Sequence, residues 1–442
     1  MRSFEMGEVT VLDMMEVRER RAERQRELLR FGETLICLTM NIPGAQKVTP
    51  LVFVAFSEGR RRIEAAMPSA RFCTEILEKT GLEAYYLVNG DASAVKRTLC
   101  AVEDETPLGR LFDIDVLQAD GEKISREALG LPPRTCFLCG RPAFLCARSR
   151  AHAVKDMTDE IARRIRAFHR EQTVKDLSEA AVDALIEEAH TTPKPGLVDE
   201  RNVGAHPDMS LNLLEKSAHA LQNYFAECAA LGYDEAPESV FPALQNAGIR
   251  AEKVMLTATG NVNTHKGAIF SLGLLCAAQA HGAAHFDASP ETVCQTAGNI
   301  ARPAMEAYFS ALTTPRTFGE RLYIEQGIRG IRGEAADGFP ALLSVLPAFS
   351  EDCKALSRRD AGVRALLRLL SRIQDTTLVK RGGDEKAARV KAEARRIEEH
   401  GFRQEDILAL DDAMISANLT CGGCADLLAC LYFLTAAPAW NE

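Results

Sequence analysis

Residues 108–117, LGRLFDIDVL, have the pattern of a β-strand that carries two acidic side chains on one face. Phe112, Ile114 and Val116 alternate with Asp113 and Asp115. Successive side chains of a strand point to opposite faces, so the apolar three are predicted to be buried and the two carboxylates to share the other face. Like charges that close repel each other unless something lies between them. The strand therefore predicts a special role for its acidic face.

The surrounding sequence alternates between strand and helix patterns. β-Branched and apolar residues predict strands within 34–56, with a Pro-Gly turn at Pro43 and Gly44, and again at 84–90 and 111–125. Helical spacing lies between them at 60–81 and 91–105. Such alternation predicts an α/β or α+β domain. We place this domain at residues 1–171.

The strand signal fades after a charged helix at 154–172, which we interpret as a linker. Nearly every later segment is an Ala/Leu-rich helix that ends at Gly or Pro. We therefore predict a two-domain chain, with an all-α second domain at residues 172–442.

Composition excludes several classes of protein. A length of 442 residues predicts two or three domains, and the net charge of −9 argues against a nucleic-acid partner. The apolar stretches 267–280 and 424–440 are shorter than the roughly 20 residues of a membrane span. Thirteen cysteines without a framework spacing, in a chain that opens on a charged amphipathic helix, predict reduced thiols and a cytoplasmic location.

Four glycine-bearing stretches run into predicted helices of the second domain, at 260–273, 330–343, 379–394 and 419–431. A helix N-terminus offers free N–H groups and partial positive charge, and glycine lets an anion approach them closely. Ordinary helix capping is the alternative. Because basic residues accompany the turns, we predict a phosphate-rich ligand. The residues involved are Lys266, Gly267, Arg329, Lys380, Arg381, Gly382, Gly383, Gly422 and Gly423.

Acidic residues near these turns suit Mg²⁺, which accompanies polyphosphates and prefers carboxylate oxygens. Helix capping would explain each of them equally well. Two loop histidines flank the suspected ligand loops and could be either structural or functional. The acids are Asp199, Glu334, Asp337, Asp384 and Asp426, and the histidines are His206 and His265.

A separate cluster, Cys136, Cys139, Cys146 and His152, has the spacing C-x2-C-x6-C-x5-H. Three thiolates and an imidazole suit a closed tetrahedral zinc site with a structural role. Buried reduced cysteines in a tight turn are the alternative.

Several of these stretches resemble known families. EEAHTTPKPGLVDERNVGAHPDM, NVNTHKGAIFSLGLL, GIRGEAADGFP, KRGGDEKA and CGGCADLLA are similar to the motifs of triphosphoribosyl-dephospho-CoA synthases. NIPGAQKVTPL, PLGRLFDIDVL and CGRPAFLCARSRAH resemble the citrate lyase holo-acyl-carrier-protein synthase family. The two families act in consecutive steps, and their fusion in this order resembles the bifunctional citrate lyase prosthetic-group proteins.

The first resemblance implies that the second domain joins ATP to 3′-dephospho-CoA. The 2′-hydroxyl of dephospho-CoA attacks C1 of the ATP ribose, adenine leaves and the triphosphate stays on the product. Such a reaction needs a carboxylate at the reacting carbon and groups that move protons. We expect them among Asp199, His206, His265, Glu334 and Asp384. Lys194, Lys266, Lys380 and Arg381 would hold phosphates.

The second resemblance implies transfer of that product to a serine of the apo acyl carrier (γ) subunit of citrate lyase, with release of pyrophosphate. Asp113 and Asp115 would bind Mg²⁺, as in nucleotidyltransferase-like domains, and the metal would remove their repulsion. Solvent-facing acids on an edge strand are the alternative interpretation. Candidates for phosphate contacts are Lys47, Arg110, Arg148 and Arg150.

Three alternative functions stay open. The second domain could be a Mg²⁺-dependent N-glycosidic hydrolase of an ADP-ribose-like substrate. The first domain could be a zinc-bearing interaction module without catalytic activity. The same chemistry could also serve the carrier protein of malonate decarboxylase.

Overall fold

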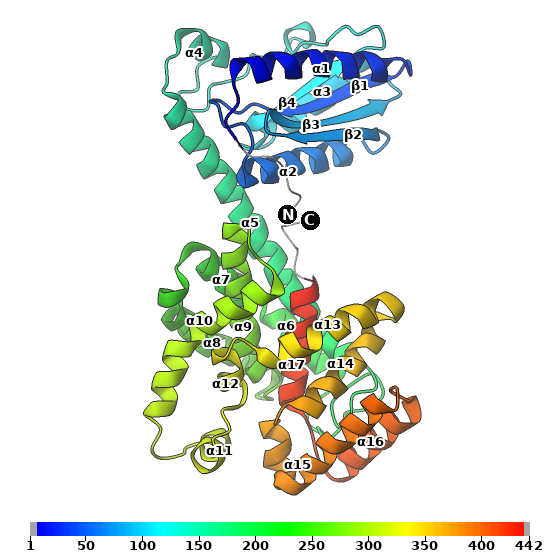
Figure 1. The fold of residues 1–442 in the computed structure, drawn as a ribbon, viewed down its shortest axis with the longest axis vertical. Coiled ribbons are helices and arrows are strands. Elements are labelled where there is room, and N and C mark those ends of the chain that lie inside the picture. The colour runs from blue at the N-terminus through cyan, green and yellow to red at the C-terminus, as the bar shows by residue number, and fades with distance from the viewer. Residues whose placement is uncertain (1–6, 437–442) are drawn as a thin grey trace. The chain divides into compact units, whose positions relative to one another are not determined.

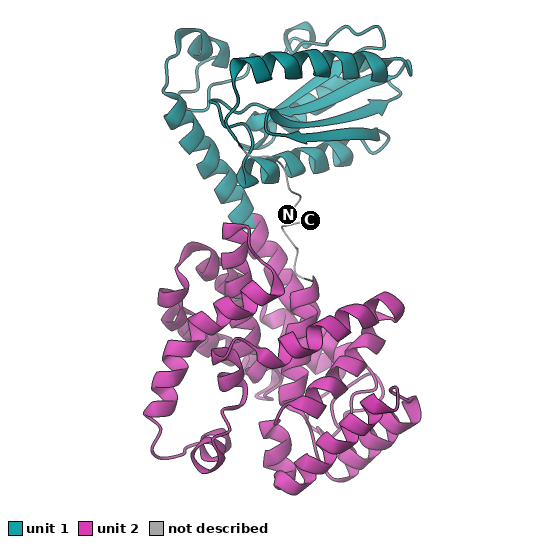
Figure 2. Cartoon of the chain, viewed as in Figure 1, with its two compact units in different colours: residues 1–171 teal, residues 172–442 magenta. Residues whose placement is uncertain are grey.

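The structure is a computed structural model that describes residues 7–436. The chain divides into two compact units, Met1–Glu171 and Gln172–Glu442 (Figure 2). The division falls inside one long helix, α5 (Val154–His190). Ile161 and Ile165 of this helix pack in the core of the first unit, whereas Leu177 and Ala181 pack in the core of the second. Each unit therefore has its own hydrophobic core.

The first unit is built on a four-stranded antiparallel sheet in the order β2-β3-β1-β4. The strands are β1 (Thr34–Met40), β2 (Arg71–Glu78), β3 (Gly81–Val88) and β4 (Phe112–Leu117). The helices are α1 (Val11–Leu29), α2 (Pro50–Ala66), α3 (Ala92–Asp104) and α4 (Ala143–Ser149), with short 3-10 turns at Gly109–Leu111 and Glu127–Leu129. A small sheet within a mostly helical chain confirms the predicted α+β character of this region.

Helices cover both faces of the sheet (Figure 1). The main core joins sheet residues such as Ile36 and Ile114 to Phe56 of α2 and Leu99 of α3. On the opposite face, buried residues of the inner strands pack against the C-terminal end of α1. Asp113 and Asp115 alternate with buried residues of β4 and therefore lie on the α1 side of the sheet.

Two details of the predicted order are wrong. The strand expected within 34–56 ends at Met40, and residues 50–56 open α2, because Thr49 caps that helix and Pro50 occupies its first position. The expected helix at 60–81 ends at Ala66, and β2 follows it. Pairing with β3 fixes residues 71–78 as a strand, which their local sequence does not show.

The outer edge of β4 is occupied by side chains. Lys96 donates from Nζ to the carbonyl of Ile114 at 2.5 Å, and Glu103 Oε1 accepts from the Ile114 N–H at 3.0 Å. Arg134 donates to the carbonyl of Phe112, and the Phe112 N–H bonds to the carbonyl of Gly109. The strand expected at 111–125 ends at Leu117, and after a tight turn the Ile124 N–H donates to the Val116 carbonyl.

The regular elements among the described residues of the second unit are all helices, as predicted. Its helices after α5 are α6 (Leu211–Ala220), α7 (Gln222–Asp234), α8 (Pro237–Thr259), α9 (Lys266–His285), α10 (Pro290–Ser310), α11 (Phe318–Gln326), α12 (Gly330–Ala336), α13 (Pro340–Ala355), α14 (Arg358–Arg372), α15 (Thr376–Glu399), α16 (Gln404–Ser416) and α17 (Gly422–Ala436).

The helices α9 and α17 lie at the centre of the second unit and pack against each other. Within the described residues, α9 alone has the length and composition of a membrane span, but 78% of its apolar window is buried inside the protein. That burial is typical of a core helix, as predicted for 267–280. The second apolar stretch forms α17 up to Ala436, and its residues 437–440 lie outside the described residues.

Candidate functional site

Helix starts gather around one cavity of about 820 Å³ in the second unit. We call it the helix-start cavity. The first residues of α9, α12, α13, α15 and α17 line it, and three of the four predicted glycine turns contribute. A set of helix N-termini around one space gives it positive potential, which favours anionic groups.

Three carboxylates occupy these helix starts, one of them buried (Asp375) and two partly buried (Glu334 and Asp426). Glu334 Oε1 accepts from the Ala341 N–H at the start of α13, at 2.6 Å. Asp375 caps α15 and also accepts from the Cys424 N–H of α17, at 2.9 Å. Asp426 lies against the start of α9, where a Cβ added to Gly267 would come within 1.9 Å of Asp426 Oδ2. The glycine at 267 is thus required by the position of this carboxylate.

The surroundings raise the pKa of all three acids. Burial is the main cause for Glu334 and for Asp375. For Asp426, burial together with the negative charges of Glu188 and Asp375 raises the pKa well above its usual range. Carboxyl groups that repel one another in a buried space form a site for a cation or a proton.

His265 presents an unsatisfied nitrogen in this cavity. Its Nδ1 atom lies 2.8 Å from Ser217 Oγ, while its Nε2 atom is buried and has no hydrogen-bond partner among the described residues. Burial lowers its pKa to about 4, so the ring is neutral at pH 7. His206 also lines the cavity, but its Nε2 bonds to Thr420 Oγ1 at 2.7 Å.

Four basic side chains line the cavity, and each is paired with an acid. Lys194 is buried and bonds through Nζ to Glu188 Oε1 at 2.6 Å. The other pairs are Lys266 with Glu252, Arg329 with Asp337, and Arg372 with Glu398. Of the predicted phosphate ligands, Lys194, Lys266, Gly267, Arg329, Gly422 and Gly423 line the cavity.

The remaining predicted residues of this domain lie outside the cavity lining. Asp199 is buried, and its two oxygens accept four hydrogen bonds within its own loop, including those from the N–H groups of Lys194 and Arg201. Arg381 approaches the site indirectly, with Nη2 3.5 Å from His206 Nδ1. Lys380, Gly382, Gly383 and Asp384 lie at a kink in α15, where Gly383 has a φ of 71°.

A second cavity of about 830 Å³ adjoins the first. Both are lined by Lys266, Gly267 and Arg329. Its walls are richer in large apolar side chains, among them Phe241 and Phe270. The pair of cavities offers adjacent space for two substrates, one polar and one with an apolar portion.

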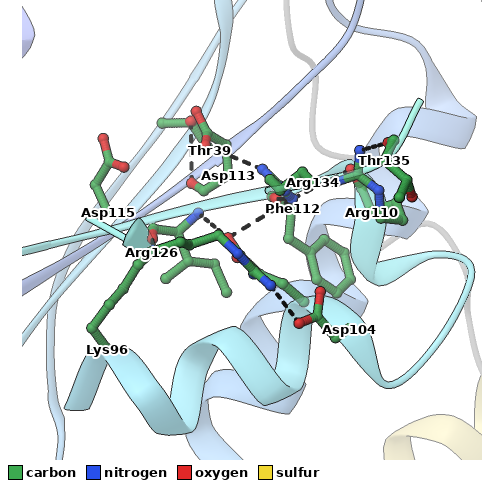
Figure 3. Close-up of polar contacts among 12 residues, drawn as sticks. Thr39, Lys96, Asp104, Arg110, Phe112, Asp113, Asp115, Arg126, Arg134 and Thr135 are labelled. Atoms are coloured by element: carbon green, nitrogen blue, oxygen red, sulfur yellow. Dashed lines mark hydrogen bonds and ion pairs between the residues drawn. The ribbon is translucent and has the colours of Figure 1, made fainter. Parts of the chain in front are cut away.

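In the first unit, each aspartate of β4 lies close to a basic side chain, and Figure 3 shows Asp113 beside Arg134. Asp113 Oδ1 lies 3.5 Å from Arg134 Nη1, and Asp115 Oδ1 lies 2.5 Å from Lys123 Nζ. These cations compensate the charges of the two aspartates. The side chain of Asp113 is half exposed, and β4 is an edge strand, so this carboxylate is accessible.

Arg110 and Arg134 lie together beside Asp113. The Arg134 side chain donates to the Arg110 carbonyl at 3.4 Å, and Arg110 donates to the carbonyl of Thr135. Burial and the neighbouring Arg134 lower the pKa of Arg110 to about 10. Arg110 Nη1 and Arg134 Nε are buried without a hydrogen-bond partner among the described residues. Two guanidinium groups with unused donors suit an oxyanion.

In the described part of the first unit, the other residues that were predicted to contact phosphate have no hydrogen bond or ion pair with Asp113 or Asp115 and make other interactions. Lys47 donates to the carbonyl of Ile42 at 2.7 Å, and burial lowers its pKa. Arg148 lies over the Phe144 ring at the exposed helix α4, and Arg150 ends that helix with a left-handed φ of 48°.

Sequence reasoning missed several residues at these sites. Arg134 and Lys123 had no motif of their own, although both follow the acidic strand closely in sequence. Glu188 and Asp375 were overlooked because neither adjoins a glycine turn, yet Asp375 precedes two threonines in the pattern of an N-cap. Only the fold brings them to the cavity and to β4.

Both units match described protein families. Residues 174–442 match the ATP:dephospho-CoA triphosphoribosyl transferases (CitG), and residues 9–168 match the apo-citrate lyase phosphoribosyl-dephospho-CoA transferases (CitX). Such a pairing of domains defines a bifunctional transferase.

Relatives with both domains extend over nearly the whole chain. Protein CitXG of Haemophilus influenzae is 32% identical over 98% of this chain and 97% of its own length. Protein CitXG of Leuconostoc mesenteroides is 30% identical over 98% of each chain. A 2-(5''-triphosphoribosyl)-3'-dephosphocoenzyme-A synthase of Haemophilus ducreyi is 33% identical over 67% of this chain and 98% of its own length.

The chain belongs to the CitXG family, the bifunctional citrate lyase prosthetic-group proteins. Its second part is the triphosphoribosyl-dephospho-CoA synthase and its first part is the apo-citrate lyase transferase. The predicted activities, their order along the chain, and ATP and dephospho-CoA as substrates are confirmed.

Proposed function

We propose that the helix-start cavity is the active site of the synthase reaction. The observation that supports this most directly is the meeting of five helix starts with three carboxylates, all buried or partly buried, in one space. The triphosphate of ATP would lie among the helix starts with Lys266 and Arg329, and the adjoining cavity would take the pantetheine arm of dephospho-CoA. The two substrates would meet at the residues that line both cavities.

In this proposal Glu334 and His265 serve the reacting centre. The 2′-hydroxyl oxygen of dephospho-CoA forms a bond to C1 of the ATP ribose, the bond from C1 to the adenine nitrogen breaks, and adenine leaves with a proton. The Glu334 carboxylate would stabilise positive charge on C1. The neutral His265 ring would accept the hydroxyl proton at Nε2 while its Nδ1–H donates to Ser217.

Mg²⁺ fits the acids of this cavity. Asp375 and Asp426 offer hard oxygen ligands next to the proposed triphosphate position, and Glu188 lies close enough to affect Asp426. When bound, Mg²⁺ would neutralise triphosphate charge. A cation at this position would compensate the negative charges of Glu188 and Asp375, which together with burial raise the pKa of Asp426.

In the first unit we propose that Asp113 and Asp115 bind the Mg²⁺ of the transfer reaction. A serine hydroxyl of the γ subunit would attack the α-phosphorus of the triphosphate, and the bond to pyrophosphate would break. Arg110 and Arg134 would bind phosphate oxygens through their unused donors. The ion pairs of Asp113 with Arg134 and of Asp115 with Lys123 would then open as the charged substrate binds.

Glu334→Gln tests the synthase site. The amide keeps an oxygen for the Ala341 N–H but loses the charge, so adenine release from ATP and dephospho-CoA should fall about 100-fold. Glu351→Gln, an exposed site on α13, is the matched control and should match the wild type. Equal adenine release by Glu334→Gln and wild type would remove Glu334 from the reaction.

The products separate this proposal from its alternatives. A coupled triphosphoribosyl-dephospho-CoA product must appear with adenine in equal amount, whereas a hydrolase would release adenine without it. Mass spectrometry of both products decides between them. The rate of modification of purified apo carrier proteins from citrate lyase and from malonate decarboxylase decides which carrier is preferred. We propose the former, in the cytoplasm.

A further inference from the structure

The segment 134–152 of the first unit folds into a compact turn and helix. The Cys136 N–H donates to the carbonyl of Arg141 at 2.7 Å, and Gly140 has a left-handed φ of 70°, which closes the turn around Cys139. Helix α4 follows at once and carries Cys146. This C-x-x-C-G turn and the following helix bring three thiols to one point.

The three sulfurs and one imidazole nitrogen form a compact set. The candidate ligand atoms of Cys136, Cys139, Cys146 and His152 all lie within 4.8 Å of one another. The sulfurs of Cys139 and Cys146 are 3.4 Å apart, and tetrahedral zinc with Zn–S bonds of about 2.3 Å separates its sulfurs by about 3.8 Å. Small side-chain rotations would therefore place all four around one ion.

Two further features indicate an ion at this place. The Nε2 atom of His152 is buried and makes no hydrogen bond with any described residue, which leaves a polar atom unsatisfied. The Arg141 side chain donates from Nε to Cys139 Sγ at 3.4 Å, as a compensating donor does for a thiolate. A site with three soft thiolates and one imidazole selects zinc over Mg²⁺.

We propose that Cys136, Cys139, Cys146 and His152 bind one structural Zn²⁺ ion that fixes the segment carrying Arg134 against β4. The four protein ligands fill the coordination sphere and leave no position for a substrate, so the ion is structural.

The effect on β4 follows from contacts at the N-terminal end of the segment. Arg134 reaches Asp113 and the Phe112 carbonyl, and the next residue, Thr135, accepts a hydrogen bond from Arg110. The carbonyl of Phe137 accepts from Arg164 of α5 at 2.9 Å. The ion would therefore stabilise the loop that positions Arg134 at the proposed transfer site. This effect on Arg134 rests on the proposed function of the first unit, whereas zinc binding itself does not.

Metal content of the full-length protein tests the zinc site. The protein is purified with a thiol reductant and without chelator, and zinc is measured by inductively coupled plasma mass spectrometry. We expect about one zinc per chain, lost in Cys139→Ser and in Cys146→Ser. Cys73→Ser, a half-buried thiol of β2 outside the cluster, is the matched control and should keep its zinc.

A spectroscopic measurement on wild-type protein tests the site without relying on the folding of a variant or on enzyme activity. Wild-type protein in which Co²⁺ replaces zinc should show thiolate-to-metal charge-transfer and tetrahedral d–d absorption bands. The proposal would be overturned if reduced wild-type protein contained no zinc and its cobalt-treated form showed neither set of absorption bands. Unchanged zinc content in Cys139→Ser would overturn it as well. A Cys139–Cys146 disulfide, found by mass spectrometry under these conditions, would also overturn it.

The two reactions of the chain then report on Arg134. Chelation of zinc should abolish transfer to the carrier protein while adenine release continues in the same sample, and added Zn²⁺ should restore transfer. If zinc is lost and transfer is undiminished, the zinc site stands but its proposed effect on Arg134 beside β4 is refuted. Loss of adenine release as well would show general unfolding and would also refute that specific action.

Discussion

Gly267→Ala should strongly reduce adenine release by the second unit. A Cβ at this position would lie 1.9 Å from Oδ2 and 2.7 Å from Cγ of Asp426. To regain an ordinary contact of about 3.4 Å, the carboxylate or the start of α9 must move by about 1.5 Å. Both line the helix-start cavity, where the triphosphate is proposed to bind.

The size of the effect follows from that displacement. A misplacement of about 1 Å in an active site can cost about 100-fold in rate, or about 2.7 kcal/mol of barrier. Overpacking should also lower the unfolding free energy by about 1–3 kcal/mol. The assay follows adenine by liquid chromatography at saturating ATP, Mg²⁺ and dephospho-CoA, below the melting temperature of the variant.

Gly319→Ala is the matched control for this substitution. Gly319 also lies at the start of a helix of the second unit, α11, but outside the helix-start cavity, and its added Cβ would meet no atom within 4 Å. Its adenine release should stay within about threefold of wild type, about 0.6 kcal/mol of barrier. Equal loss in both variants, or full activity of Gly267→Ala, would refute the role assigned to Asp426. Transfer of pre-made triphosphoribosyl-dephospho-CoA should remain intact in either variant.

Three other predictions concern the acid pair, pH and the division of the chain. Asp113→Asn should reduce transfer to the apo carrier protein at least about 100-fold, with adenine release unchanged, as measured on one sample; normal carrier modification would contradict the metal role. Burial lowers the pKa of His265 to about 4, so the unfolded state binds more protons and stability is lost as pH falls from about 6.5 to 4. Urea titrations should show His265→Gln losing less stability than wild type in that window, by up to about 1.4 kcal/mol per pH unit, and parallel curves would disprove the link. Residues 1–171 and 172–442, expressed separately, should each fold and catalyse their own step, because each retains its own core; loss of both steps would refute the division.

Local patterns predicted the elements whose burial is periodic. The alternation of Phe112, Ile114 and Val116 predicted β4, and the glycine turns predicted the starts of α9 and α17. The strand β2 was missed because its residues are largely half exposed and its pairing with β3 is set by the fold. Similarity to known families, rather than pattern, predicted the two reactions.

The site residues likewise divide into those that local sequence predicts and those that only tertiary packing reveals. Glu334 and His265 lie next to glycine turns, so a local search found them, and both line the cavity. Asp199 had the same local context, but its carboxylate organises its own loop, which only the three-dimensional hydrogen bonds reveal. Asp375 and Arg134 come to their sites through tertiary packing, which no local spacing encodes.

The side chains along the outer edge of β4 also limit how a protein substrate can approach. With the Ile114 backbone bound by Lys96 and Glu103, and the Phe112 backbone bound on the same side, an incoming polypeptide cannot extend the sheet beside Asp113. A carrier protein modified at the proposed site would therefore not be bound by strand pairing at this edge. Recognition of the carrier protein would then depend on side-chain complementarity. The same blocked edge also prevents two copies of the chain from pairing through β4.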